Sequence, residues 1–332
     1  MTRRRRSNRS KRKNGWKKWI IISLTIFGLL LAGTAAYGLY LTNTAKNFVD
    51  GAQQELETRQ HEGKSKMRST KVDPSIDNIS ILFLGVDDSS TRNFGSATRT
   101  DAMILATFNE EEKSIKMVSI PRDSRVELAG RNTMDKITHA HAFGGIDMAV
   151  NTVENLFEIP VDYFVRVNFE AFVEIINALD GVEVDVPFEI YEQNSEDEKN
   201  AIHINEGLQT LNGEEALAFV RTRKYDSDIA RGHRQQQLLK ALLQKTVSIQ
   251  SVTKYDDVLK GIGENLTTNM SFDEMTAFHD YAYQGSKLDV EMLSMEGQAS
   301  RIDHLYYYLL NDESVENIST EFKQHLELEV IE

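Results

Sequence analysis

The residues best suited to chemistry in this 332-residue chain are arginines that gather in one short stretch. Residues 219–239, FVRTRKYDSDIARGHRQQQLL, hold four arginines although the chain has a net charge of −13. Asp228 is a suitable N-cap for a helix that starts at the next residue, which places Arg231 in the first turn and Arg234 one turn later. A helix N-terminus carries about half a positive charge, so arginines there favour a bound anion such as phosphate. The alternative is a surface helix that pairs its arginines with Asp226 and Asp228.

One face of this predicted helix changes character along its length. It is polar at Arg231, Arg234 and Gln235 and apolar at Leu238 and Leu242. Residues spaced by three and four share a helical face, so a ligand with a charged head and an apolar tail would fit along it.

A second charged group is expected where three predicted strands meet. Residues 79–86, 102–108 and 114–120 are apolar runs of strand length. Only five residues separate the second and third runs, which fits a hairpin and excludes a crossover helix; the link between the first and second also fits an antiparallel return. The end of the first strand, the start of the second and the end of the third then share one sheet edge. These positions hold Asp87, Asp88, Arg99, Asp101, Arg122 and Asp123.

Carboxylates from different strands beside arginines are typical of a hard divalent cation next to an anionic ligand. Mg²⁺ is usually held by one or two carboxylates together with substrate phosphates. The alternative for each aspartate is a turn residue at a strand end.

The remaining pattern mixes helices and strands. Residues 145–157, 172–179, 211–220 and 229–249 are predicted helices, and residues 161–169 and 182–188 are predicted strands. This mixture predicts an α/β fold with helices on a central mixed sheet. We assign residues 78–249 to a catalytic core and residues 250–332 to a helix-rich C-terminal part with one late strand at 289–293.

The N-terminal segment predicts a membrane anchor. Residues 1–18 form a basic tail, and residues 19–41 contain no charged side chain, which is long enough to cross a bilayer. The positive flank places the tail in the cytoplasm and the rest of the chain outside the cell. A cleaved signal peptide is the alternative. Residues 42–77 are polar and are predicted to form a stalk.

Several other chemistries find little support. The chain has no cysteine, which excludes disulfides, thiolate catalysis and cysteine-ligated metals and favours a bacterial exported protein. His139 and His141 could share a strand face and bind zinc, but no third ligand is near. Neither a phosphate-binding Walker motif nor a nucleophile elbow is present. The basic tail lies beside an apolar segment and therefore indicates topology, so no nucleic-acid partner is predicted.

Seven motifs taken together carry a resemblance to a known family. ILFLGVDD, TRTDAMILATFN, VSIPRDSRV, DKITHAHAFGG, IPVDYFVRVNFEAFVEIINALDGVEVDV, GLQTLNGEEALAFVRTRKYDSD and RGHRQQQLLKAL resemble the LytR-CpsA-Psr family in order and spacing, over about residues 78–245. The resemblance implies a Mg²⁺-dependent enzyme, mostly of Gram-positive bacteria, that moves an anionic glycopolymer such as teichoic acid or capsule from undecaprenyl pyrophosphate to peptidoglycan. It also implies an apolar tunnel for the lipid between the sheet and its helices.

The resemblance further implies roles for individual residues. It makes Asp87 and Asp101 magnesium ligands. It makes Asp87, Asp101 and Arg122 the catalytic residues. It makes pyrophosphate ligands of Arg99, Arg122, Lys136, Arg221, Arg223, Arg231, Arg234 and Gln235. The proton acceptor is left open among Asp87, Asp101 and Asp123. Two departures concern shape: His139 and His141 replace other polar or aromatic residues, and no glycine precedes Arg99.

Two alternative functions remain for the same site. A receptor for the lipid or the anionic polymer would bind without forming product. A pyrophosphatase on the same lipid-linked polymer would release a phosphorylated polymer without an acceptor. The identity of the polymer and the oligomeric state do not follow from the sequence.

Overall fold

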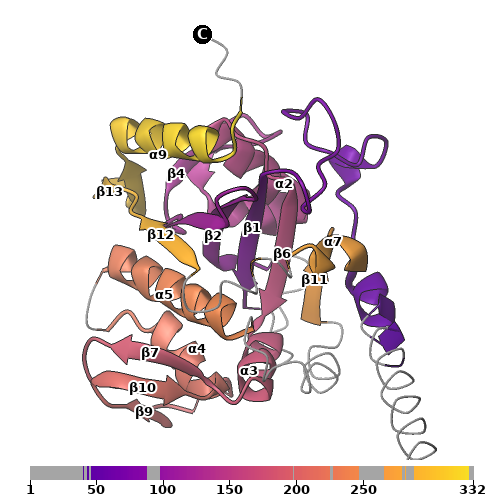
Figure 1. Cartoon of the computed structure of the whole chain (residues 1–332). Helices are drawn as coiled ribbons and strands as arrows, with labels where there is room; N and C mark the ends of the chain where they lie inside the picture. Colours follow the sequence, from indigo (N-terminus) through magenta and orange to yellow (C-terminus); the bar gives the residue numbers. More distant parts are fainter. Residues whose placement is uncertain are drawn as a thin grey trace, which may run out of the picture. The chain divides into compact units, whose positions relative to one another are not determined.

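A six-stranded mixed sheet organises the chain (Figure 1). The strand order is β11-β6-β1-β2-β3-β12. The strands are β1 (Ile79–Val86), β2 (Thr100–Asn109), β3 (Ser114–Ser119), β6 (Tyr163–Asn168), β11 (Leu266–Thr268) and β12 (Asp289–Leu293). The β1–β2 and β2–β3 pairs are antiparallel, as the short connections predict, whereas β6 and β12 join the sheet in parallel.

The computed structural model describes most of the chain beyond its N-terminal segment. The described residues are 40, 43–44, 46–87, 98–196, 198–224, 227–246, 265–278, 281 and 288–328. The predicted transmembrane segment, residues 19–41, lies outside them except for Tyr40. Among the described residues, no helix combines the length and the apolar character that a bilayer crossing requires. Residues 45–332 form one unit, to which the following description refers.

Helices cover both faces of the sheet, which is why β1 is buried on both faces and apolar apart from Ser80. Leu82 and Leu84 pack on one face against α2 (Thr138–Phe157) and α9 (Asp312–His325). Ile79 and Ile81 belong to the opposite face, which carries side chains of α5 (Asp228–Thr246) and α7 (Phe272–Thr276). The side chains of successive strand residues point to opposite faces, so one strand serves both clusters.

Smaller elements surround this sheet. A subsidiary layer contains α3 (Phe169–Ala178), β7 (Val182–Val186), β8 (Ile190–Glu192), β9 (Ile202–Ile204), β10 (Gly207–Leu211) and α4 (Gly213–Arg221). Two further hairpins are β4 (Arg125–Leu128) with β5 (Thr133–Lys136), and β13 (Gly297–Ile302) with β14 (Leu305–Leu310). The subsidiary layer has its own apolar cluster, into which Leu238 of α5 packs.

The C-terminal part contributes more to the sheet than its sequence predicts. Residues 250–332 are predicted to be helix-rich with one strand, but their described part holds four strands, β11 to β14, beside α7 and α9. Strands β11 and β12 form the two outer positions of the central sheet. Strand β11 has only three residues, too few for a periodic signal, and its pairing with β6 is a long-range contact.

Residues 49–72, which the sequence assigned to a stalk, are packed on the domain. Val49 and Leu56 are buried, and a short helix, η1 (Glu57–Arg59), brings Arg59 to α2. Arg59 Nη2 donates to Glu154 Oε1 at 2.8 Å and Nη1 to the carbonyl of Val161 at 2.6 Å. Glu154 also accepts a hydrogen bond from Ser65 Oγ. The segment is thus held by buried charges as well as apolar contacts.

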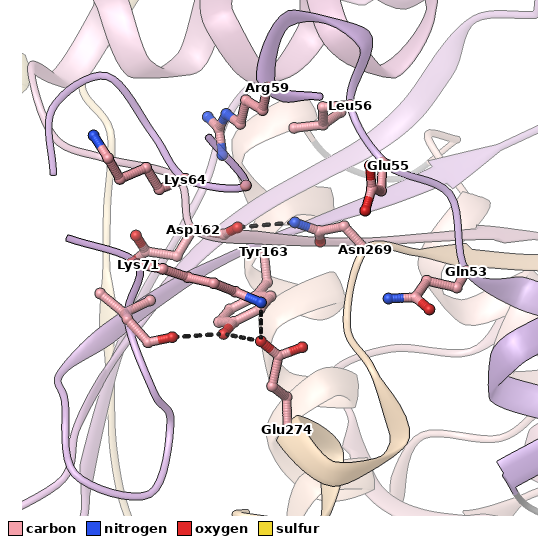
Figure 2. Close-up of a pocket in the computed structure, with 12 residues that line it drawn as sticks. Gln53, Glu55, Leu56, Arg59, Lys64, Lys71, Asp162, Tyr163, Asn269 and Glu274 are labelled. Atoms are coloured by element: carbon pink, nitrogen blue, oxygen red, sulfur yellow. Dashed lines mark hydrogen bonds and ion pairs between the residues drawn. The ribbon is translucent and has the colours of Figure 1, made fainter. Parts of the chain in front are cut away.

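This packed segment also closes a polar pocket (Figure 2). Lys71 Nζ and the hydroxyl of Tyr163 both approach Glu274 Oε1, at 3.1 and 3.0 Å. Burial and the Glu274 carboxylate raise the pKa of Tyr163, which keeps its hydroxyl a donor. Lys71 pairs with Glu274 inside the pocket, and Arg59 and Asp162 pair with Glu154 and Arg68 beside it. These pairs attach residues 49–72 to the rest of the domain.

Replacement of Arg59 by alanine is expected to destabilise the fold strongly. It leaves Glu154 charged and buried without its cation, which typically costs about 3–5 kcal/mol. Urea denaturation measures this change. The matched control is Lys323→Ala, since Lys323 pairs with the exposed Glu158 and such pairs contribute about 0–1 kcal/mol. Equal effects of the two replacements would contradict the assignment.

His325 is expected to make stability depend on pH. Its ring is buried between Thr107 Oγ1, 2.8 Å from Nδ1, and Ser114 Oγ, 2.9 Å from Nε2. Burial, with Lys116 nearby, lowers the pKa of His325. The unfolded chain therefore binds a proton more readily, so the stability that is present above about pH 6.5 is lost as the pH falls toward the lower folded-state pKa. Melting temperatures between about pH 5 and 8 should fall less steeply on acidification in His325→Gln.

Candidate functional site

Three strands bring the predicted acidic and basic residues to one sheet edge. Asp87 follows the end of β1, Asp101 lies at the start of β2, and Arg122 and Asp123 follow β3. Arg122 Nη1 forms an ion pair with Asp101 Oδ1, and Arg122 Nε lies 3.7 Å from Asp123 Oδ2. The expected convergence of these positions is confirmed by the antiparallel register of the strands. Asp88 lies outside the described residues.

The start of α2 braces this edge. Thr138 Oγ1 donates to the carbonyl of Thr100 at 2.7 Å, and His141 Nδ1 lies 2.7 Å from the carbonyl oxygen of Thr98. His139 instead pairs with Asp135 Oδ2 at 2.9 Å. The two histidines lie on a helix and serve different partners. No cluster of three or more metal-ligating side chains occurs in the part of the chain that the structure describes.

Lys136 reaches the same cluster from β5. Its Nζ lies 2.7 Å from Asp123 Oδ1, and Asp123 is only 6% exposed. The hairpin β4–β5 returns the chain so that Lys136 faces the end of β3. Lys136 remains partly exposed on the open side of the cluster, so its ammonium can meet a ligand.

Helix α5 forms the opposite wall of the site. At Gly232, an added Cβ would lie only 2.9 Å from Ser119 Oγ of β3, so glycine permits the close approach. Gln236 fixes the helix there, because its amide donates to the carbonyls of Met117 at 3.0 Å and Leu293 at 3.1 Å. Ser119 Oγ also donates to Gln235 Oε1 at 3.3 Å. Arg231 directly precedes Gly232 and is therefore held close to β3 by the same contact.

Arg231 is a buried cation with unused hydrogen-bonding capacity. It is 4% exposed, its Nη1 lies 3.2 Å from Asp228 Oδ1, and its buried Nε has no acceptor among the described residues. Burial, together with the like charges of Arg223 and Arg122, lowers the pKa of Arg231 to about 10. The side chain stays charged at neutral pH in surroundings that disfavour the charge, and a bound anion would relieve that cost.

The motif implies that Arg234 is a pyrophosphate ligand, but in the structure its guanidinium contacts backbone carbonyls. Its Nε donates to the carbonyl of Phe219 at 2.9 Å and its Nη2 to the carbonyl of Thr222 at 2.7 Å. Both carbonyls lie at the C-terminal end of α4, where backbone acceptors lack helical partners. Arg234 therefore joins α5 to α4, and these hydrogen bonds explain its burial.

The remaining predicted cations lie around the cluster. Arg223 is about half exposed, with Nε 3.8 Å from Asp228 Oδ1. Arg221 packs its guanidinium 4.8 Å from the ring centre of Phe169. Arg99 is exposed beside the start of β2, and within the described ranges it has no ion pair. The cations that the structure brings together are thus Arg122, Lys136 and Arg231, with the more exposed Arg223 beside them.

The apolar residues of α5 divide between two clusters. Leu238 and Leu242, predicted to approach a lipid tail, pack against the subsidiary layer. Leu239 and Leu243 instead face the central sheet, beside partly buried Phe83. The two leucines of α5 that face the sheet are therefore each one position later in the sequence than the two that were predicted to approach the lipid.

The sequence analysis also missed aromatic residues at this site. Tyr306 and Tyr307 of β14 each place a ring centre 5.8 Å from Lys136 Nζ. The run LYYYLL at residues 305–310 is strand-like, but its distance along the sequence gives no sign of the contact.

These features define an α/β domain in which cations and carboxylates gather between a sheet edge and a helix start. A model of the LytR_cpsA_psr family matches residues 44–324. The polyisoprenyl-teichoic acid–peptidoglycan teichoic acid transferase TagT of Bacillus subtilis (strain 168) is 37% identical over 325 residues, covering 97% of this chain and 98% of the relative. The chain belongs to the LytR_cpsA_psr family.

Solved structures agree with this assignment. The structure described as TagT bound to LIIa-WTA matches with a TM-score of 0.71 and 37% identity, over 83% of this chain and all of that one. The LytR-CPS2A-psr family protein YwtF (TagT) with bound octaprenyl pyrophosphate lipid matches with a TM-score of 0.66 and 34% identity, over 81% of this chain and 98% of that one. The central mixed sheet with helices on both faces is the fold of these proteins.

The two helix arginines are expected to respond differently to replacement. Arg234→Met removes hydrogen bonds to two buried carbonyls and should lower the free energy of unfolding by about 2–6 kcal/mol, at about 1–3 for each group left unsatisfied. Arg231→Met removes a poorly solvated cation and should leave stability unchanged or raised, while it weakens binding of a polyprenyl pyrophosphate. Calorimetric unfolding and lipid titration of both variants test this contrast. A stable Arg234→Met protein would contradict it.

Proposed function

We propose that this protein transfers an anionic glycopolymer, with its linking phosphate, from an undecaprenyl pyrophosphate carrier to peptidoglycan. The single observation that carries the proposal is the buried Arg231 guanidinium, which lies close enough to Arg122 for each charge to disfavour the other. A dianionic pyrophosphate between them would stabilise both cations. The teichoic acid transferase activity for which TagT is named, in a relative that matches this chain nearly end to end, supports the same reaction class.

Each wall of the site has a separate task in this reaction. Arg122 and Lys136 on the sheet side and Arg231 on the helix side would bind the two phosphoryl groups and neutralise the charge that grows on the leaving lipid phosphate. The partly buried Leu239, Leu243 and Phe83 support an apolar path for the lipid between α5 and the sheet. The acceptor proton would pass to one of the carboxylates Asp87, Asp101 or Asp123, as a general base must lie within reach of the attacking hydroxyl.

Asp87 and Asp101 would hold the magnesium ion. They lie at adjacent ends of β1 and β2, where Val86 pairs with Thr100, and they offer the hard oxygen ligands that Mg²⁺ prefers. The ion would supply charge neutralisation at the phosphoryl oxygens. Arg122, which pairs with Asp101, would orient that carboxylate toward the site.

The proposal includes a location at the cytoplasmic membrane. Residues 19–41 would form a single-pass anchor with the basic tail in the cytoplasm and the catalytic domain outside the cell, in a Gram-positive bacterium. The carrier lipid would lie in that same membrane. No nucleic acid is required by this arrangement.

Transfer by the full chain in lipid nanodiscs tests the proposal. Undecaprenyl-pyrophosphate-linked glycopolymer and a peptidoglycan oligomer should yield linked product with Mg²⁺, and chelation should remove the activity until Mg²⁺ is restored. Arg231→Met and Asp101→Asn should each lower the rate by about 10²–10³-fold, the usual loss when a charge-stabilising group is removed.

The same assay separates the alternative functions. Lipid binding without product would indicate a receptor, and phosphorylated polymer released without an acceptor would indicate a pyrophosphatase. Lys323→Ala is the control, since Lys323 lies on α9 and pairs with an exposed carboxylate. Full activity in both Arg231→Met and Asp101→Asn would refute the site.

A further inference from the structure

The C-terminal hairpin β13–β14 docks directly on the anion-binding cluster. The backbone N–H of Tyr308 donates to the carbonyl of Asp123 at 2.9 Å, and Tyr308 forms an isolated parallel bridge with Ser124. These backbone contacts fix β14 against the turn that follows β3. The two residues before Tyr308 are thereby brought to the open side of the cluster.

Lys136 is held there from three sides. Its ammonium lies 2.7 Å from Asp123 Oδ1 and 5.8 Å from the ring centres of both Tyr306 and Tyr307. An ammonium within about 6 Å of a ring centre is attracted by the negative face of the ring. A lysine side chain has several rotatable bonds, so one ion pair leaves it mobile, whereas two rings and a carboxylate restrict it to one position.

The two tyrosines differ in how they are supported. Tyr307 is 7% exposed, and its ring also faces the guanidinium of Arg125 at 5.9 Å, so it is a fixed part of the wall. Tyr306 is 37% exposed and lies toward the opening. Burial and the nearby carboxylates of Asp228 and Asp123 raise the pKa of Tyr306, so it is neutral at physiological pH and adds no negative charge against the ligand.

We propose that Tyr306 and Tyr307 are positioning residues that hold the Lys136 ammonium at the pyrophosphate site. The inference rests on the proposed function and assigns part of the active site to the C-terminal hairpin. Lys136 then acts as the third cation beside Arg122 and Arg231, on the side of the site where the acceptor must enter. The rings act through Lys136, and their aromatic faces are the feature that matters.

Kinetics of the full chain in lipid nanodiscs test this assignment. Tyr306→Leu and Tyr307→Leu should each lower kcat/KM for the lipid-linked polymer by about two- to fivefold, the range expected for loss of one cation–π contact, and the double variant by about tenfold. Tyr306→Phe and Tyr307→Phe keep the rings and should retain wild-type rates. In a Lys136→Met background the leucine replacements should cause no further loss, because the contact they remove is already gone.

Each outcome decides one question. Equal losses from leucine replacements with and without Lys136 would show a structural effect and overturn the inference, as would a tenfold loss in Tyr306→Phe, where the ring remains. Leu305→Ala, at an exposed neighbour in the same strand, should change neither rate nor melting temperature. A wild-type chain that forms no product would overturn the proposed function and this inference with it, whereas an active wild type with unaffected leucine variants would overturn only the inference.

Discussion

The close contact between α5 and β3 is the constraint on which the site depends. Gly232 lies where any larger side chain would meet Ser119, and the buried amide of Gln236 joins the helix to β3 and to the end of β12. This packing carries Arg231 into the domain to within electrostatic reach of Arg122 and Asp101. Burying a cation beside like charges is unfavourable, and such local cost is commonly retained where a ligand offsets it.

The cluster is assembled from distant parts of the chain for a physical reason. Phosphoryl transfer needs positive charge on several sides of the reacting group, and no single helix or loop can surround a ligand. The ends of β1, β2 and β3 supply one wall, α5 supplies another, and β14 reaches Lys136 from the C-terminal part. Each wall is fixed by buried hydrogen bonds: Thr138 to Thr100, Gln236 to Met117, and Tyr308 to Asp123.

The arginines of the motif separate into two kinds according to their surroundings. Arg231 is buried with an unused donor, as a ligand-binding side chain would be, whereas Arg234, one turn along the same helix, donates hydrogen bonds to carbonyls at the end of α4. Residues three apart share a helical face, but Arg231 and Arg234 have different partners, since Arg231 pairs with Asp228 and Arg234 contacts α4. A motif match alone therefore assigns both residues the same role, and the packing distinguishes them.

The sequence by itself determined the sheet edge and the helix start. The short connection before Ser114 allowed only a hairpin, which placed Asp101 and Arg122 at one edge. The predicted N-cap at Asp228 was wrong by one residue, since α5 begins at Asp228 and Ser227 Oγ accepts from the backbone N–H of Ala230 at 3.2 Å, but the pattern still placed Arg231 near the helix start. These are local rules of spacing and capping. Only the tertiary structure decided the role of Arg234, the packing of residues 49–72 and the contact between Lys136 and the tyrosines of β14. These contacts join residues far apart in the chain, and local propensity and periodicity carry no information about such pairs.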